Sequence, residues 1–400
     1  MSARFAVRRA VTWRRVVAAA TAGAVLAAAV GGGAASAAPS TPEHRSTATV
    51  LQHGLDDLHD LGVSGAQGLV RDGGRVTMAR SGVADLDTDA PMPVDGYFRI
   101  GSTTKTFVSV VLLQLVGEGR VGLDDPIDRW LPGVVDGNGN DGRQITVRQI
   151  LQHTSGLYDS TGDLAALQSA DEFLAHRFDH YTEAQLVTMA MQHPPLFPAG
   201  TSWSYSNTNY LVAGMLIERV TGHRWSTEVR SRILMPLHLT HTFYPGDRPT
   251  LPQPHAQGYR QFAPGGPMVD TTIFNPTVTA SAGGLVSTTA DLARFWQALS
   301  RGELLRPGQM AELRQTVLAD GFQGIRPGIR YGLGIMWIPN RCGGSWAHVG
   351  SMPGMSTLTA VSPDGQRSTV LYLATELADP EPAMAVIQRQ MTLLDDLICS

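Results

Sequence analysis

Residues 97–107 read Tyr-Phe-Arg-Ile-Gly-Ser-Thr-Thr-Lys-Thr-Phe, and they mark the point where a strand pattern meets a helix pattern. The aromatic and β-branched residues predict a short strand over 97–100. The nearly continuous apolar residues that follow predict a buried helix from Ser102 to about residue 116. Lys105 lies three positions after Ser102, so both side chains share one face of that helix. A serine at a helix N-terminus beside an amine suits a nucleophile and its base.

Lysine usage in the chain singles out Lys105. The sequence holds 31 lysine and arginine residues together, and Lys105 is the one lysine among them. An arginine side chain keeps its proton in a protein, whereas a buried lysine can lose it. A chance Ser-x-x-Lys spacing is the alternative interpretation. The retention of one lysine at this position favours an amine that must become neutral.

The first 37 residues have the pattern of a secretory signal peptide. Several arginines precede an apolar, alanine-rich stretch over 16–30, which is shorter than the roughly 20 residues of a membrane span. Small residues at 35–37 form a cleavage pattern, so we expect the mature chain to begin near Ala38. We predict secretion by the Sec route or, because of Arg14-Arg15, by a twin-arginine route. No later segment is predicted to span a membrane.

Charge and length restrict the function classes. The formal net charge is −4; loss of residues 1–37 would remove five arginines and no acidic residue, giving −4 − 5 = −9. An acidic protein is a poor partner for nucleic acid or an anionic membrane. The roughly 363 residues that would remain exceed the usual size of one core and predict two lobes.

The order of the predicted elements defines the fold class. A helix near 49–61 and a hairpin over 66–79 precede the strand at 97–100, and helices with loops fill 145–279. Short strand patterns then return in four places: 331–338, 345–349, 356–361 and 369–374. A terminal helix is expected over 381–397. We therefore predict an α/β two-lobe fold, with an antiparallel sheet flanked by helices (about 48–101 and 281–400) and an inserted all-α lobe (about 102–280).

Two weaker patterns do not indicate a cofactor or a metal. The glycines of 137–142 match a dinucleotide-binding pattern in letters only, because no strand leads into them, and we predict a surface loop. His176 and His180 could share a helix face, but no third ligand is apparent, so solvated histidines are the better interpretation. Cys342 and Cys399 give no zinc-site spacing. Export favours a disulfide between them, with two buried thiols as the alternative.

Three short motifs occur in a fixed order along the chain. Ser102-Thr103-Thr104-Lys105 opens the buried helix, Tyr205-Ser206-Asn207 lies on a loop of the helical region, and His348-Val349-Gly350 ends a predicted strand. In these motifs the chain resembles the serine penicillin-recognising enzymes, which include DD-peptidases, class C β-lactamases and related esterases. The resemblance extends from about residue 50 to 395, and it implies a β-lactamase/transpeptidase-like fold for that domain, residues 38–400.

The resemblance implies roles for the motif residues. Ser102 would be the nucleophile, with Lys105 and Tyr205 as the catalytic acid–base pair. Asn207 would bind Lys105 and a substrate amide, and His348 would face a substrate carboxylate or polarise Tyr205. The residues at the end of the third motif, Gly350 and Ser351, would line the substrate site, and the backbone N–H groups of Ser102 and Ser351 would form the oxyanion hole. Ser155 is a rival nucleophile, but no base follows it at a suitable spacing.

Histidine in the third motif and two cysteines in these places are similar to the secreted actinomycete D-alanyl-D-alanine carboxypeptidases. That likeness implies a monomeric enzyme without a cofactor that acts on peptidoglycan peptides ending in D-Ala-D-Ala and is inhibited by β-lactams. Val349 departs from the threonine common in the peptidases, so two other readings stay open. One is a β-lactamase, esterase or D-aminopeptidase on the same scaffold, and the other is a non-catalytic penicillin-binding or wall-binding protein.

Overall fold

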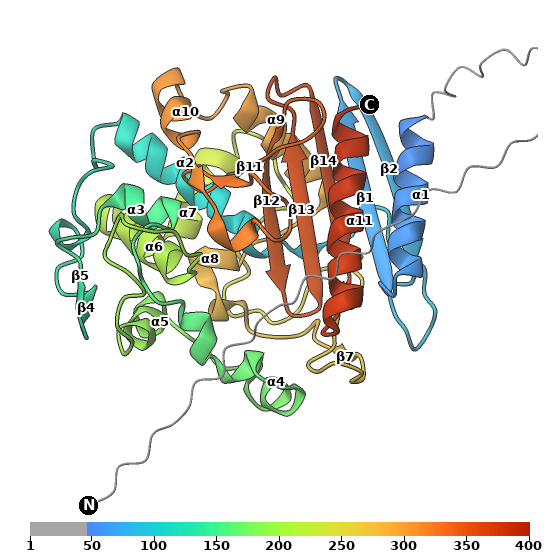
Figure 1. Ribbon diagram of the computed structural model, residues 1–400, viewed down its shortest axis with the longest axis horizontal. Helices are drawn as coiled ribbons and strands as arrows, with labels where there is room; N and C mark the ends of the chain where they lie inside the picture. The colour runs from blue at the N-terminus through green and yellow to red at the C-terminus, as the bar shows by residue number, and fades with distance from the viewer. Residues whose placement is uncertain (1–45) are drawn as a thin grey trace, which may run out of the picture. The chain divides into compact units, whose positions relative to one another are not determined.

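A computed structural model describes residues 46–400, and these residues fall in one compact unit (Figure 1). The predicted signal peptide, residues 1–37, lies outside the described residues. Among the described residues, no helix is both long enough and apolar enough to cross a bilayer.

The largest feature is an eight-stranded antiparallel sheet with the order β2-β1-β14-β13-β12-β11-β10-β9. Its strands are β1 (Gly65–Asp72), β2 (Arg75–Gly82), β9 (Val317–Leu318), β10 (Arg330–Tyr331), β11 (Met336–Ile338), β12 (Ser345–Met352), β13 (Met355–Val361) and β14 (Arg367–Leu373). The register places Leu69 opposite Val370, so the N-terminal hairpin joins the C-terminal strands in one sheet. This confirms the antiparallel sheet that the sequence predicts.

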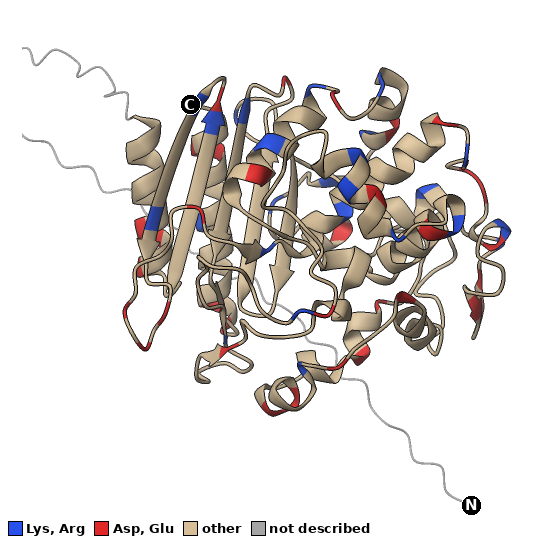
Figure 2. Ribbon diagram, turned by 180° about the vertical axis from the view of Figure 1, so that it is seen from behind, with Lys and Arg blue, Asp and Glu red and all other residues tan. Residues whose placement is uncertain are grey.

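Helices cover both faces of this sheet. On one face lie α1 (Thr47–Asp60) and α11 (Pro380–Ile398), which pack together; α1 covers β1 and β2, and α11 covers β13 and β14 (Figure 1). On the other face lies α9 (Thr289–Ser300). Side chains alternate along β14 accordingly, since Leu371 joins the core under α1 and α11 whereas Val370 joins the core under α9. Charged residues lie mainly on helices, loops and strand ends, while the strands themselves carry few (Figure 2).

Helices and loops make up most of the chain between β3 and β8. The helices here are α2 (Thr104–Gly117), α3 (Val147–Gln152), α4 (Ala170–His176), α5 (Glu183–Ala190), α6 (Thr208–Thr221), α7 (Trp225–Val229) and α8 (Ala280–Gly283), and α10 (Pro307–Leu313) follows later. Helix α2 is buried on almost every side, as its apolar sequence predicts, and it packs against α6, α7 and α8. Helix α2 therefore presents its N-terminal end to the junction between these helices and β12.

Three small sheets complete the described part of the chain. Strand β3 (Phe98–Arg99) pairs with β8 (Val286–Ser287), β4 (Asp136–Gly137) pairs with β5 (Asn140–Asp141), and β6 (Tyr259–Arg260) pairs with β7 (Val269–Asp270) and β15 (Thr375–Glu376). The glycine-rich loop predicted over 137–142 thus forms most of the short β4–β5 hairpin. The strand predicted at 97–100 exists, but it lies outside the main sheet.

One predicted strand, 331–338, is wrong as a continuous element. It divides into β10 and β11, and Gly334 between them has a φ of +85°. A Cβ at Gly334 would lie 2.1 Å from the Ser109 hydroxyl of α2, so the chain bends here to fit against that helix.

The structure confirms the disulfide between Cys342 and Cys399. It joins the turn between β11 and β12 to the end of α11, and the two residues are 57 positions apart. The bond therefore holds the terminal helix against the same strand pair that leads into the third motif.

Candidate active site

Ser102 lies in a 3₁₀ turn, Gly101–Thr103, that leads directly into α2. Gly101 has a φ of +51°, and a Cβ there would lie 2.6 Å from the backbone nitrogen of Ser351 in β12. On the other side of this contact, a Cβ at Gly350 would lie 2.0 Å from the Ile100 carbonyl oxygen. Two glycines thus allow the Ser102 turn and β12 to meet backbone to backbone.

Lys105 is fully buried one turn after Ser102. Its Nζ lies 2.9 Å from Ser102 Oγ, 2.7 Å from Asn207 Oδ1 and 2.7 Å from the Ala282 carbonyl oxygen. Burial lowers the pKa of Lys105 to about 7, although the negative charge of Asp159 acts in the opposite direction. A substantial fraction of this amine is therefore neutral near pH 7 and can accept a proton from Ser102.

Tyr205 precedes α6 and places its ring against Lys105, with Nζ 4.9 Å from the ring centroid. The Tyr205 hydroxyl is buried and has no protein hydrogen-bond partner of good geometry among the described residues. Burial raises the pKa of Tyr205 well above 10, while the nearby Ser102 hydroxyl lowers it. The phenol is therefore protonated at neutral pH, and its proton is available to a group that enters the site beside Ser102.

Strand β12 supplies a free backbone edge at the same place. Its ladder with β11 ends at Ala347, so 348–352 has no strand partner on that side. Ser351 is exposed within this segment, and its N–H lies beside the Ser102 turn. The N–H groups of Ser102 and Ser351 are the two candidate donors to a developing oxyanion.

Comparisons with known proteins bear on this arrangement. The β-lactamase family model matches residues 47–391, which is most of the chain. The chain belongs to the β-lactamase family. The matched range contains all three motifs.

Several known proteins are similar to this chain over most of their length. A D-stereospecific amidohydrolase from Streptomyces sp. is 40% identical, with a TM-score of 0.77 and coverage of 84% of this chain and 97% of the other. The D-amino acid amidase from Ochrobactrum anthropi SV3 is 28% identical, with a TM-score of 0.75 and coverage of 88% and 99%. A penicillin-binding protein of Bacillus subtilis (strain 168) is 26% identical over 80% of this chain and 70% of its own length.

Asn207 contacts Lys105, and it has a second partner that sequence reasoning missed. Its Oδ1 accepts from Lys105, while its Nδ2 donates to Asp159 Oδ2 at 3.0 Å. Asp159 therefore fixes the orientation of the Asn207 amide, since only the oxygen can face the Lys105 amine. The two residues are 48 positions apart, so no local motif could have revealed the pair.

His348 lies behind the site, near enough for the charge of Lys105 to act on it, and the hydroxyl that it binds is that of Tyr331. It has no exposed surface, so it does not face a substrate carboxylate, and it lies on the sheet face opposite to Ser351. Its Nδ1–H donates to the Val349 carbonyl, and its Nε2 accepts from the Tyr331 hydroxyl at 2.9 Å. Burial and the charge of Lys105 lower the pKa of His348 to about 3, so the imidazole is neutral at neutral pH.

The other residues considered from the sequence, Ser155, His176 and His180, are not part of this site. Ser155 is buried, and its hydroxyl donates to Asn209 Oδ1 at 2.6 Å, which fits a structural role. His176 ends α4 and pairs with Asp179, whereas His180 lies beyond that helix and pairs with Asp247. Within residues 46–400, no three histidine, cysteine or acidic side chains are placed to hold a metal ion.

Proposed function

We propose that this protein hydrolyses amide bonds next to D-configured amino acid residues through an acyl-enzyme on Ser102. The observation that carries the proposal is the hydrogen bond from buried Lys105 to Ser102, within a family-shared arrangement of Tyr205 and Asn207. A non-catalytic binder has no need of an amine whose pKa is brought to about 7 beside a serine.

The proposed reaction begins with neutral Lys105. It takes the Ser102 proton as Oγ attacks the substrate carbonyl carbon, and the carbonyl oxygen becomes an oxyanion between the N–H groups of Ser102 and Ser351. The tetrahedral intermediate then expels the amine, which receives a proton from the Tyr205 phenol. The proton that Lys105 took then passes to the Tyr205 oxygen, which restores the acid–base pair. In the second half, water attacks the ester: its oxygen joins the acyl carbon, the bond to Ser102 Oγ breaks, one water proton goes to Oγ, and the free acid leaves.

The substrate class follows from the relatives and from His348. The relative that is 40% identical bears the name of a D-stereospecific amidohydrolase. A carboxypeptidase must bind a terminal carboxylate, and the neutral, buried His348 offers it no positive charge. We therefore favour amides and peptides of D-amino acids, and keep D-Ala-D-Ala carboxypeptidase activity as the second candidate because penicillin-binding relatives exist.

The test compares four compounds on the purified protein. D-phenylalanine amide should be hydrolysed much faster than L-phenylalanine amide, and a peptide ending in D-Ala-D-Ala should be a poorer substrate. Benzylpenicillin should form an adduct that intact mass and peptide mapping place on Ser102. Ser102→Ala should abolish hydrolysis and adduct, while the matched control Ser155→Ala should retain the adduct. Turnover of the D-Ala-D-Ala peptide alone would support the second candidate, and no turnover of any compound would overturn both.

We also propose that the protein is exported, as residues 1–37 and the disulfide suggest, and that it acts as a monomer. Sequencing the N-terminus of protein collected from the culture medium should give a start near Ala38. Recovery of intact residues 1–37 from the cytoplasm would contradict export.

A further inference from the structure

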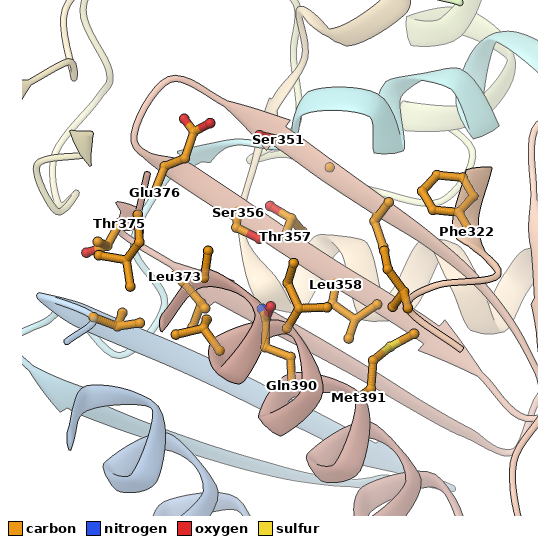
Figure 3. Close-up of a pocket in the computed structure, with 18 of the residues that line it drawn as sticks. Phe322, Ser351, Ser356, Thr357, Leu358, Leu373, Thr375, Glu376, Gln390 and Met391 are labelled. Atoms are coloured by element: carbon orange, nitrogen blue, oxygen red, sulfur yellow. The ribbon is translucent and has the colours of Figure 1, made fainter. Parts of the chain in front are cut away.

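A cavity of about 340 Å³ lies between the sheet and the first half of α11 (Figure 3). Its walls are mainly apolar. They include Ile325, Ile329, Met336, Leu358, Leu373 and Met391. Its volume is in the range of pockets that hold small ligands or one large side chain.

The cavity adjoins the proposed reaction site without containing its catalytic side chains. It is lined by Val349, Gly350 and Ser351, which belong to the free edge segment of β12. Phe322 forms another wall, and its ring lies edge-on to the Tyr205 ring with centroids 6.2 Å apart. A substrate residue held along this edge can therefore direct a side chain to the α11 face of the sheet, since side chains alternate between faces.

Several polar side chains line this space, among them Ser356, Thr357 and Glu376, and Gln390 is the one that enters it from α11. Gln390 of α11 is only 6% exposed, and its Nε2 has no hydrogen-bond partner among the described residues. Figure 3 shows its amide directed from the helix into the cavity, near Leu358 and Leu373. A buried donor without a partner destabilises the protein, and an acceptor on a bound ligand would remove that cost.

We propose that this cavity binds the side chain of the D-amino acid residue whose carbonyl reacts with Ser102, and that it selects a large apolar side chain with a hydrogen-bond acceptor at its tip. A phenolic side chain meets both conditions, because its ring fits the apolar walls and its oxygen can accept from Gln390 Nε2. This inference rests on the proposed function, and it narrows the substrate class for the same site.

The first experiment measures kcat/KM for the amides of D-alanine, D-phenylalanine and D-tyrosine. Ala383 lines the cavity from α11, so Ala383→Phe should fill part of it. We expect Ala383→Phe to lower kcat/KM for the two aromatic amides by tenfold or more, on the order of a lost hydrophobic contact, and to leave D-alanine amide within about twofold. Met384→Phe is the control, because Met384 is 41% exposed and does not line the cavity. Equal losses for all three amides, or no loss, would overturn the inference.

The second experiment removes the Gln390 amide. Gln390→Leu keeps the size of the side chain and deletes the donor, so the preference for D-tyrosine amide over D-phenylalanine amide should fall about tenfold. An unchanged ratio would contradict the role given to Gln390.

A third measurement separates failure of the cavity from failure of the proposed function. Alkyl and aryl boronic acids bond to a nucleophilic serine without any amide turnover. If no D-amino acid amide is hydrolysed, the proposed function fails, but the boronic acids still report on the cavity. We expect a (4-hydroxyphenyl)ethyl boronic acid to bind at least tenfold more tightly than methylboronic acid, and Ala383→Phe to remove the difference. Equal affinities in the original protein would overturn the cavity assignment.

Discussion

Ser102, Lys105, Tyr205 and Asn207 form one contact group in the structure, yet each motif that contains them is only three or four residues long. The sequence could predict these residues because the family's motifs are local. It could not predict Asp159, which acts through Asn207, nor the burial of His348, which depends on Tyr331 from another strand. Such partners are set by tertiary packing, which leaves no local spacing to read.

The unique lysine gives the first prediction. Lys105→Arg keeps a positive charge but removes an amine able to lose its proton. We expect the rate of Ser102 acylation by benzylpenicillin to fall by roughly 10²–10⁴-fold, while circular dichroism and the thermal midpoint show a folded protein. Near-normal acylation of this variant would mean that Tyr205 acts without the amine.

The second prediction concerns pH. The pKa of Lys105 is lowered to about 7 by burial, and only the neutral amine can act as a base. The acylation rate should therefore rise with pH through about 7 and then level off. Asp159 raises that pKa, so Asp159→Asn should move the midpoint to lower pH. A rate that is independent of pH between 5 and 9 would exclude Lys105 as the base.

At the scale of elements, the sequence predicts the N-terminal hairpin, the buried helix α2 and the long strands correctly, because their apolar patterns are strong and local. It misses the division into β10 and β11, since that bend arises from a contact of Gly334 with α2, which lies far away in the chain. The open edge of β12 likewise depends on a neighbouring strand. The ladder with β11 stops at Ala347, and this leaves 348–352 unpaired on that side.

Gly350 gives a prediction at this scale. Gly350→Ala would bring a Cβ against the Ile100 carbonyl, so β12 and the Ser102 turn must separate. We expect stability to fall by about 1–3 kcal/mol and acylation to fall about 100-fold as one oxyanion donor moves away. Gly74→Ala is the control, because nothing lies within 4 Å of a Cβ there. Equal acylation by the Gly350 variant and the control would show that this contact does not position the site.

Buried His348 leads to a prediction of how the stability of the protein depends on pH. Burial lowers the pKa of His348 to about 3, against about 6.5 in an unfolded chain. The unfolded state therefore binds the extra proton, so the stability from neutral His348 is present above pH 6.5 and is lost as the pH falls toward 3. Urea unfolding should show that the free energy of unfolding changes less with pH in the His348→Gln variant than in the original protein. Within this window the two slopes should differ by up to about 1.4 kcal/mol per pH unit. Parallel pH profiles for the two proteins would contradict this.

At the scale of the whole molecule, the disulfide joins the terminal helix α11 to the main sheet. Replacing Cys342 and Cys399 by alanine should lower the free energy of unfolding by about 4 kcal/mol, which is the chain-entropy estimate for a loop of this length. Denaturant unfolding with and without reductant measures the change. Titration of the unfolded, unreduced protein should find no free thiol, and two free thiols would contradict the bond.

The pairing of β1 with β14 also has a consequence for how the protein folds. Thr369 donates its hydroxyl hydrogen to the Leu69 carbonyl, across a separation of 300 positions. Until residues 367–373 arrive, one edge of the β1–β2 hairpin stays open and apolar, and such an edge can pair with another chain. Contacts so distant in sequence also make folding slow. A chaperone that shields this hairpin should therefore raise the yield of refolded protein more than it raises the stability of the finished fold.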